Sequence, residues 1–567
     1  MKILKFIFTL LFLVTSVSVS TKMYSQNNLV SYQEKDLSLL LTTYKINTER
    51  LNKYYNFHSS PQYIKRAFNH FKNYKKVLKN IKYSKLNNTQ QVDYQLLKRN
   101  LSIELKRLNE KKTYLKATEK WINDGAFLYE IAFKSQQGTT PNPEELAKKI
   151  TIAINKTKSN IKKIEKENPI FSYEESGFLI TALNEQKKAL NNLSDLFDSF
   201  LPNYKATITN VKIEFEKQID LFVKKVQEKS KRKEVSPLGK EKFQEFLSET
   251  KTIPYSINEI SEIATRFFDS SQKETKVISA KMGFGDNWEQ AYEKVKSSFV
   301  KLGKQPATVL KLQNDALQFI KKNDLVTVPE IMKETWAFGM IPGVLQKRFP
   351  FFLGGPKLLI AYPSLSMKKE DQLQIMRMNN PHFSRSVLFH EIIPGHFMQV
   401  YFEDIYKPYR KGFGYGSSWA EGMAFYWELL LYEKGFAKSN EDKLGMLFFQ
   451  KLRAARVITS INYHTKKWTK EQCIAFFKNQ VGADDFVAIS ESNRAFTSYP
   501  ISYLIGGLQF LSLKKELVDS GKMSLKDFHN KMYQENYIPM NLFRYALKGE
   551  KIPEKIPNSW RFQSLNN

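Results

Sequence analysis

The chain contains only seven histidines, and two of them flank one short segment, His390-Glu391-Ile392-Ile393-Pro394-Gly395-His396. Imidazole nitrogens are good zinc ligands, and a neighbouring glutamate can take a proton from a water molecule that the metal activates. The residues just before the segment, 383–389, are mostly apolar, so His390 and Glu391 should reach the interior as polar side chains that need partners. The segment therefore predicts a metal site, with Glu391 as general base.

The six-residue spacing of the two histidines departs from the common zinc-binding pattern, in which histidines four residues apart share one helix face. Six residues of an ideal helix turn through about 240°, so the rings would not face one metal. Pro394 cannot donate to the carbonyl of His390, and Gly395 tolerates unusual dihedral angles. We therefore expect a two-residue bulge, with the helix distorted from Ile393 to Gly395. The alternative is a proline-broken core helix with incidental histidines.

A second chemical signal lies in the apolar segment from Ser418 to Tyr432, which predicts a buried helix. Its only charged residues, Glu421 and Glu428, are seven positions apart and so about 20° from a common face. Buried carboxylates need a cation, hydrogen-bond donors or raised pKa values. We expect Glu421 to be the third zinc ligand and Glu428 to accept a hydrogen bond from an imidazole N–H. A capping box with Ser418 would explain Glu421 but not Glu428.

The elements that must position these side chains are mainly helices. Between residues 31 and about 230, apolar residues recur at helical spacing, as in Leu37, Leu41 and Tyr44. The best strand signal is the apolar segment from Phe351 to Pro363, which contains glycines and prolines at its limits. It predicts a small β-sheet beside the histidine helix. That sheet is either plain core or offers an edge strand that pairs with an extended peptide.

Length and the N-terminus indicate an exported protein of more than one domain. The 567 residues are 42% hydrophobic, enough for a large core. Lys2 and Lys5 precede an apolar run and small residues, which predicts a signal peptide over 1–20. We expect a helical domain at 21–235 and a catalytic domain at 236–567. The apolar run is too short to span a bilayer, and no later stretch qualifies as an integral membrane segment.

The cysteine count bears on where the protein is located, and the charge distribution bears on which partners it binds. The only cysteine, Cys473, cannot form an intramolecular disulfide, and we expect a periplasmic or secreted protein. The net charge of +31 comes from lysines spread along the whole chain, without a basic arm or a nucleic-acid motif. We therefore expect no nucleic-acid partner.

The two motifs together, His-Glu-x-x-Pro-Gly-His and Glu-Gly-x-Ala-x-Tyr-x-Glu, resemble those of a large bacterial family, domain of unknown function 885 (DUF885). The match covers about Pro237 to the end of the chain, with the N-terminal helices matching more weakly. The resemblance implies a mainly α, zincin-like metallopeptidase fold with a deep cleft. It also implies zinc bound by His390, His396 and Glu421, with Glu391 as the general base. Further similar residues follow in order: 467–472, Arg494, 503–506 and 528–529.

The chain departs from the family pattern at several positions near these motifs. Phe397 stands where a second histidine is common, and Met423 stands where tryptophan is usual. The segment from Ser460 to His464 replaces Asp-x-Gly-x-His. The expected metal ligands survive these changes, whereas the surroundings of the metal and the substrate contacts differ.

The expected reaction is hydrolysis of a peptide bond by a zinc-activated water molecule. Tyr503 and His464 are our candidates for stabilising the oxyanion of the intermediate. Arg494 could pair with a substrate carboxylate, which would favour short peptides or C-terminal trimming. Each of these three residues also has a structural interpretation, as a core side chain or an ion pair.

Two other functions compete with a zinc peptidase that acts on peptide substrates. One is a metal-dependent amidase acting on a non-peptide amide, because the same site serves both reactions. The other is a non-catalytic periplasmic binding protein with a decayed metal site. The intact set of His390, Glu391, His396 and Glu421 argues against decay.

Overall fold

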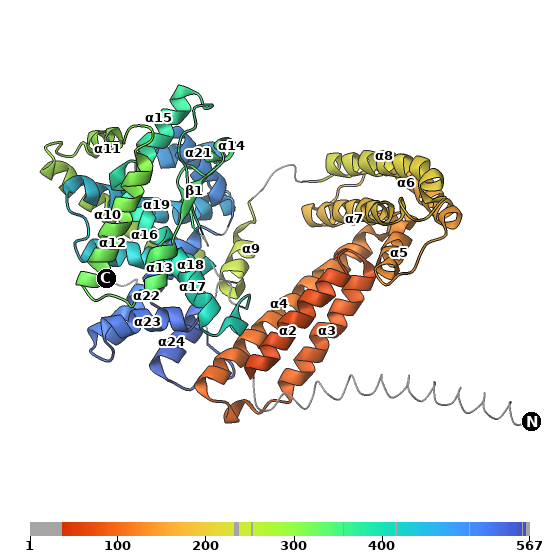
Figure 1. Cartoon of the computed structure of the whole chain (residues 1–567), viewed down its shortest axis with the longest axis horizontal. Helices are drawn as coiled ribbons and strands as arrows, with labels where there is room; N and C mark the ends of the chain where they lie inside the picture. Colours follow the sequence, from red (N-terminus) through yellow and green to blue (C-terminus); the bar gives the residue numbers. More distant parts are fainter. Residues whose placement is uncertain are drawn as a thin grey trace, which may run out of the picture. The chain divides into compact units, whose positions relative to one another are not determined.

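The computed structural model is mainly helical and contains one small three-stranded sheet, which confirms the coarse fold class (Figure 1). The predicted signal peptide lies outside the residues that the structure describes. These are 37–231, 237–250, 253–354, 357–413, 417–497, 499–557 and 559–562.

The chain divides into two compact units. The first contains Met1–Leu86 and Asp93–Val235, and the second contains Asn87–Val92 and Ser236–Asn567. The sequence did not predict that residues 87–92 belong with the second unit. Their contacts are specific: Ile552 N–H donates to Gln91 Oε1 at 2.8 Å, and Asn88 Nδ2 donates to the carbonyl of Glu550 at 2.6 Å.

The first unit is built from long helices that bury their own apolar core. Tyr44 on α2 donates to Asn100 on α4, and Asn47 on α2 donates to Tyr74 on α3, so these helices pack side by side (Figure 1). The helices are α2 (Leu37–Tyr54), α3 (Pro61–Lys79), α4 (Asn88–Thr118, of which the residues from Asp93 onward belong to this unit), α5 (Phe127–Ser135), α6 (Pro143–Glu167), α7 (Tyr173–Phe197) and α8 (Tyr204–Glu228), with short turns η1 (Tyr83–Lys85), η2 (Glu119–Trp121) and η3 (Asp124–Ala126).

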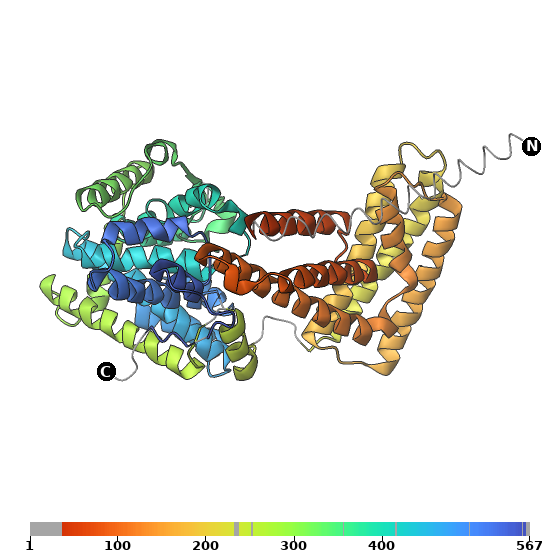
Figure 2. The ribbon, with the colours of Figure 1, turned by 90° about the horizontal axis from the view of Figure 1, so that it is seen from below.

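The second unit is organised around one central helix, α19 (Asn440–His464), which is buried over almost its whole length. It contacts α10, α16, α21 and α22. In Figure 2 the cyan and blue helices of this unit lie between green helices at one edge and the yellow-green α10 at the other. Its first helices are α9 (Lys240–Glu245), α10 (Ile257–Lys281), α11 (Trp288–Ser297), α12 (Gln305–Lys322), α13 (Glu330–Thr335), α14 (Gly343–Gln346) and α15 (Lys369–Met378).

The helices that bear on the predicted site come next in the chain. They are α16 (Pro381–Glu391), α17 (His396–Ile405), α18 (Ser417–Glu433), α20 (Lys470–Phe476), α21 (Asp485–Ala495), α22 (Ile501–Lys514), α23 (Leu525–Gln534) and α24 (Met540–Lys548). Short 3-10 and π segments complete the unit: η4 (Phe246–Thr250), η5 (Pro408–Arg410), η6 (Phe477–Val481) and η7 (Lys515–Asp519).

The small sheet consists of β1 (Phe338–Met340), β2 (Phe352–Leu353) and β3 (Leu358–Ile360). The order is β1-β3-β2, with β1 parallel and β2 antiparallel to β3. Strand β2 therefore stands at an edge of the described sheet, and it packs against α16. This position matches the edge-strand interpretation of the apolar segment.

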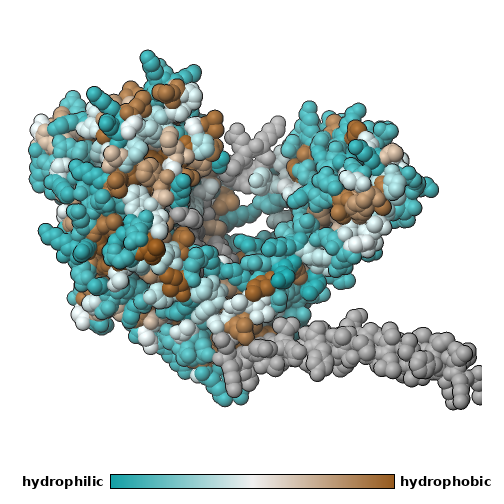
Figure 3. Space-filling model, viewed as in Figure 1, coloured by the Kyte–Doolittle hydropathy of each residue, from teal (hydrophilic) through white to brown (hydrophobic). Residues whose placement is uncertain are grey.

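The surface is mixed in character. Figure 3 shows a mainly hydrophilic face with apolar residues scattered in small groups. Scattered apolar residues are normal on a protein surface and indicate no docking face by themselves. Within the described part of the chain, no helix is both long and apolar enough to cross a membrane.

Candidate metal centre

The histidine motif lies at a junction between two helices. Helix α16 ends at Glu391 and α17 begins at His396, so the expected bulge within one continuous helix is wrong. The distortion does fall at Ile393 to Gly395, and the Ile393–Pro394 peptide bond is cis. The chain leaves one helix and starts another, which turns the second histidine back toward the first.

Two contacts fix this junction. The hydroxyl of Tyr533 donates to the carbonyl oxygen of Pro394. A Cβ atom at Gly395 would collide with the backbone carbonyl of His390, so the position requires glycine because of close approach. Its φ of −82° is ordinary for any residue.

His390, His396 and Glu421 meet around one point. Glu421 Oε2 lies 3.4 Å from Nε2 of each histidine. In a tetrahedral zinc site with bonds of about 2.1 Å, neighbouring ligand atoms are roughly 3.4 Å apart. Glu421 Oε2 is buried and has no hydrogen-bond partner among the described residues, so a cation is the partner that it lacks. These three side chains therefore fit a zinc ion.

Two carboxylates stand close enough to compete for the third ligand position. Ligand atoms of His390, Glu391 and His396 also lie within 4.8 Å of one another. Glu421 is the better ligand because its oxygen is nearer to both imidazoles and otherwise unsatisfied. Burial opposes its charged form, but the two histidines outweigh burial and hold the pKa of Glu421 well below its usual range.

Both imidazoles are oriented by an oxygen on their far side. His390 Nδ1 lies 2.6 Å from Glu428 Oε1, although the approach is oblique, and His396 Nδ1 lies 3.1 Å from Gln399 Oε1. Gln399 is itself oriented, because its Nε2 donates to the carbonyl of Ala420 at 3.1 Å. A proton on each Nδ1 leaves the Nε2 lone pairs for the metal. The expected role of Glu428 agrees with this geometry, and Gln399 was missed.

Glu391 is placed beside the ligands as a base would be. It is 8% exposed, and burial raises its pKa above the usual value for a glutamate. A Cβ atom at Gly354, directly after β2, would collide with its carboxylate and crowd His396. The position therefore requires glycine, because the backbone there approaches Glu391 and His396 closely.

The three candidate ligands, His390, His396 and Glu421, form part of the wall of a cavity of about 340 Å³ that lies within the second unit. Strand β2 contributes to one wall. Three arginines and three tyrosines supply most of the remaining polar groups: Arg453, Arg456, Arg494, Tyr499, Tyr503 and Tyr537.

Tyr503 lines the cavity as expected. Its ring lies nearly parallel to that of His390, with ring centres 6.0 Å apart, and burial raises its pKa above the usual value. A second tyrosine, Tyr499, was missed; its hydroxyl donates to Glu421 Oε1. Both phenols therefore stay protonated at neutral pH and can donate hydrogen bonds.

His464 is the predicted site residue that the structure places elsewhere. It ends α19, eight residues beyond Arg456, which corresponds to about 12 Å along the helix. Its Nδ1 accepts a hydrogen bond from Leu238 N–H at 3.3 Å, and its ring packs on Phe243. The expected oxyanion role of His464 is therefore incorrect, and its role is to tie α19 to the start of the second unit.

The arginines of the cavity are held by acids. Arg494 lies at the end of α21, with Nε 3.7 Å from Glu491 Oε1. Arg456 pairs with the same Glu491 through two nitrogens, Nη2 at 2.7 Å and Nε. Arg453 Nη2 donates to Glu428 Oε1 at 3.0 Å. The sequence did carry a signal for Arg453 and Arg456, because two arginines three residues apart share a helix face within the otherwise apolar segment from Leu452 to Ile458.

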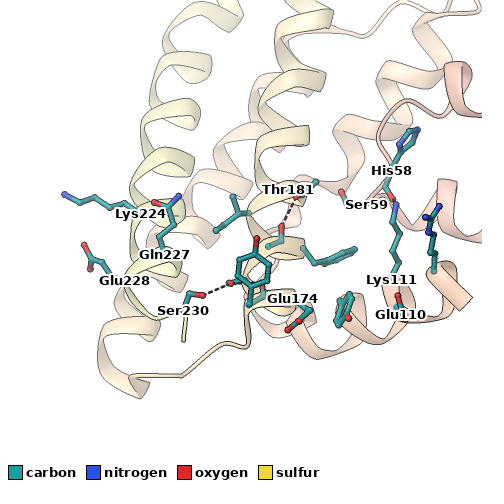
Figure 4. A pocket seen from close by; sticks show the side chains of 17 residues that line it. His58, Ser59, Glu110, Lys111, Glu174, Thr181, Lys224, Gln227, Glu228 and Ser230 are labelled. Atoms are coloured by element: carbon teal, nitrogen blue, oxygen red, sulfur yellow. Dashed lines mark hydrogen bonds between the residues drawn. The ribbon is translucent and has the colours of Figure 1, made fainter. Parts of the chain in front are cut away.

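A larger cavity, of about 900 Å³, lies in the first unit (Figure 4). Its polar residues bond to their neighbours: Lys111 Nζ donates to the carbonyl of His58 at 3.1 Å, and Ser230 pairs with Ser176 at 2.9 Å. In the described chain, a group of three metal-ligating side chains occurs at the smaller cavity and not here. The candidate metal centre therefore lies in the second unit.

Two solved structures are similar to this chain. One is a "putative lipoprotein of unknown function" from Shewanella oneidensis, with a TM-score of 0.66 and 16% identity, covering 90% of this chain and 100% of that chain. The other is a "putative lipoprotein" from Colwellia psychrerythraea, with a TM-score of 0.56 and 16% identity, covering 90% and 97%. At this identity the likeness establishes the fold alone.

The remaining comparisons concern sequence. No curated protein matches the chain. The family model described as "Bacterial protein of unknown function (DUF885)" matches residues 56–547, and so extends further toward the N-terminus than expected. The chain belongs to the bacterial DUF885 family.

Proposed function

We propose that this protein is a zinc-dependent peptidase with a zincin-like catalytic unit. The observation that carries the proposal is the buried, unsatisfied Glu421 Oε2, 3.4 Å from Nε2 of both His390 and His396. Glu391 beside them is buried and lines the same cavity. This donor set is that of a zinc hydrolase.

The chain's own groups account for the proton transfers of peptide hydrolysis. A zinc ion held by the three ligands would polarise the scissile carbonyl and make a water molecule more acidic. Glu391 takes the proton from that water and passes it to the leaving amine. Tyr503, which lines the same cavity, remains the candidate for hydrogen bonding to the developing oxyanion, because His464 lies elsewhere and the hydroxyl of Tyr499 already donates to Glu421.

Strand β2 favours a peptide over a non-peptide amide as the substrate. It stands at the edge of the sheet and lines the cavity, and Gly354 directly after it borders Glu391. An extended peptide can add to such an edge by main-chain hydrogen bonds, which a small amide cannot use along its length. The expected export to the periplasm or beyond is part of the same proposal, and the lipoprotein descriptions of the two similar structures support it.

Metal content and one substitution test this function. The purified protein should hold about one zinc per chain, and Glu391→Gln should retain the zinc while losing about 10²- to 10⁴-fold in peptide hydrolysis. Glu370→Gln, an exposed change on α15, is the matched control and should keep full activity. Zinc far below stoichiometry would refute the metal centre. Undiminished cleavage of a peptide library by Glu391→Gln would refute the assigned base.

A further inference from the structure

We propose that Arg453, Arg456 and Arg494 bind the C-terminal carboxylate of the substrate, which makes the protein a peptidase that removes residues from C-termini. The inference rests on the proposed function and adds the substrate class. It is carried by three features of the cavity wall: donors without partners, an unbalanced positive charge, and the link between Arg453 and a zinc ligand.

The two inner arginines keep donors that the described protein does not use. Arg453 and Arg456 are 4% and 2% exposed, and both line the cavity. Arg453 Nε and Arg456 Nη1 are buried without a hydrogen-bond partner among the described residues. Unsatisfied buried donors on a charged group are costly, so such groups commonly mark a place where a ligand supplies the acceptor.

The charged side chains of the cavity wall carry one unpaired positive charge, which one bound anion would neutralise. Three arginines face the two acids that hold them, Glu428 and Glu491, which leaves one positive charge in excess. Glu391 and Glu421 do not offset this excess, because their two negative charges match a divalent zinc ion. A single carboxylate would balance the cavity, and a guanidinium fork suits its two oxygens.

The position of Arg453 places that anion close to the bond that is cut. Arg453 Nη2 is 3.0 Å from Glu428 Oε1, and the same oxygen is 2.6 Å from Nδ1 of the zinc ligand His390. One carboxylate therefore separates the arginine from a ligand of the metal. Since consecutive Cα atoms are about 3.8 Å apart, the bound carboxylate should belong to a residue within one or two positions of the scissile bond.

The size of the cavity agrees with a short C-terminal segment. Its volume of about 340 Å³ is near the lower end of the range for small-molecule pockets. Arg494 is the outermost of the three, with 28% of its side chain exposed, and can meet an incoming carboxylate first.

The first test compares substrates on the unmodified, zinc-loaded protein. Three N-acetylated peptides of one sequence are used: a free C-terminal acid, its C-terminal amide, and an amide with glutamate as the last residue. We expect kcat/KM for the acid to exceed that for the plain amide by at least about 100-fold. Equal values for acid and plain amide would overturn the inference while leaving the peptidase intact.

The other outcomes of this comparison are also decisive. If the glutamate amide is cleaved as well as the acid, the arginines recognise a side-chain carboxylate and the C-terminal assignment is overturned. If none of the three is cleaved by zinc-loaded protein, the proposed function fails and the inference fails with it.

The second test uses variants and a binding measurement. Arg494→Gln should raise KM for the acid at least about 10-fold and raise KM for the amide much less, because the lost contact is to a charged group. Arg266→Gln, on the outer helix α10, should change neither. Calorimetry on inactive Glu391→Gln should show tighter binding of the acid than of the amide. An equal loss on acid and amide in Arg494→Gln would overturn the carboxylate contact.

Discussion

At the scale of single residues, several buried charges of the second unit are paired around the candidate metal centre. Glu428 connects two of these groups, because its Oε1 lies 2.6 Å from His390 Nδ1 and 3.0 Å from Arg453 Nη2. Burial opposes its charged form, but Arg453 and His390 outweigh burial and lower its pKa. The carboxylate can therefore hold the imidazole proton and leave Nε2 for the metal.

Glu428→Gln tests that positioning role. Loss of the negative charge should weaken zinc binding about 10- to 100-fold, because the imidazole is less firmly oriented and less basic. Competition with a coloured chelator measures the affinity directly and needs no substrate. Glu433→Gln, an exposed change on the same helix, serves as the control. An unchanged zinc affinity in Glu428→Gln would contradict the assigned role.

Lys451 is a buried charge of a different kind. Its Nζ has no hydrogen-bond partner among the described residues and lies 4.0 Å from the ring centre of Trp288 and 5.3 Å from that of Tyr292. These rings favour the cation, whereas burial disfavours it more strongly and lowers the pKa of Lys451 to about 7. In the unfolded chain the lysine keeps its usual pKa, near 10.5.

The sign of the resulting pH dependence follows from proton uptake. Between about pH 7 and 10.5, unfolding takes up a proton at Lys451, so its contribution to the free energy of unfolding rises with pH. Below about pH 7 the lysine is charged in both the folded and the unfolded chain, so the cost of burying its charge lowers the free energy of unfolding in full. Lys451→Met should therefore stabilise the protein at pH 7, by on the order of a few kcal/mol, and by much less at pH 10. Urea unfolding at both pH values measures this difference, and a constant difference would contradict the buried neutral lysine.

At the scale of elements, the close packing of α18 and α22 sets the position of Glu421. A Cβ atom at Gly422 would collide with the backbone of Gly506, and one at Gly506 would collide with the carbonyl of Ser418. The two backbones therefore touch directly. Glu421 stands next to this contact on α18, and Tyr503 stands one turn before it on α22.

Gly422→Ala should force these helices apart. We expect a loss of about 1–3 kcal/mol in the free energy of unfolding, together with weaker zinc binding because Glu421 moves. Gly177→Ala is the matched control, because a Cβ there meets nothing within 4 Å; it should gain up to about 1 kcal/mol from helix propensity. Calorimetric unfolding and zinc titration report the two effects. A neutral Gly422→Ala would show that the helices can separate at no cost.

At the scale of the whole molecule, the candidate metal centre lies within one unit. Every residue that lines the metal cavity belongs to the second unit, and the first unit has its own core and its own cavity. Residues 87–92 nevertheless belong with the second unit, through the contacts of Asn88 and Gln91. The second unit therefore includes a short segment, residues 87–92, that lies in the sequence between the two parts of the first unit.

Local sequence alone predicted the mainly helical class, the strand segment at 351–363 and the three side chains that meet at the candidate metal centre. Residue type, burial and periodicity are local properties, and buried His390, His396 and Glu421 could be satisfied together in few ways. Spacing did not determine how the histidines converge, because the junction at Pro394 and Gly395 ends one helix and begins another. The tertiary structure alone placed Gln399 and Tyr499 in the site and removed His464 from it, and it showed that Arg453 and Arg456, whose sequence signal was missed, line the cavity. Packing between helices decides which part of a long buried helix such as α19 reaches the cavity. The sequence of that one helix does not encode this choice.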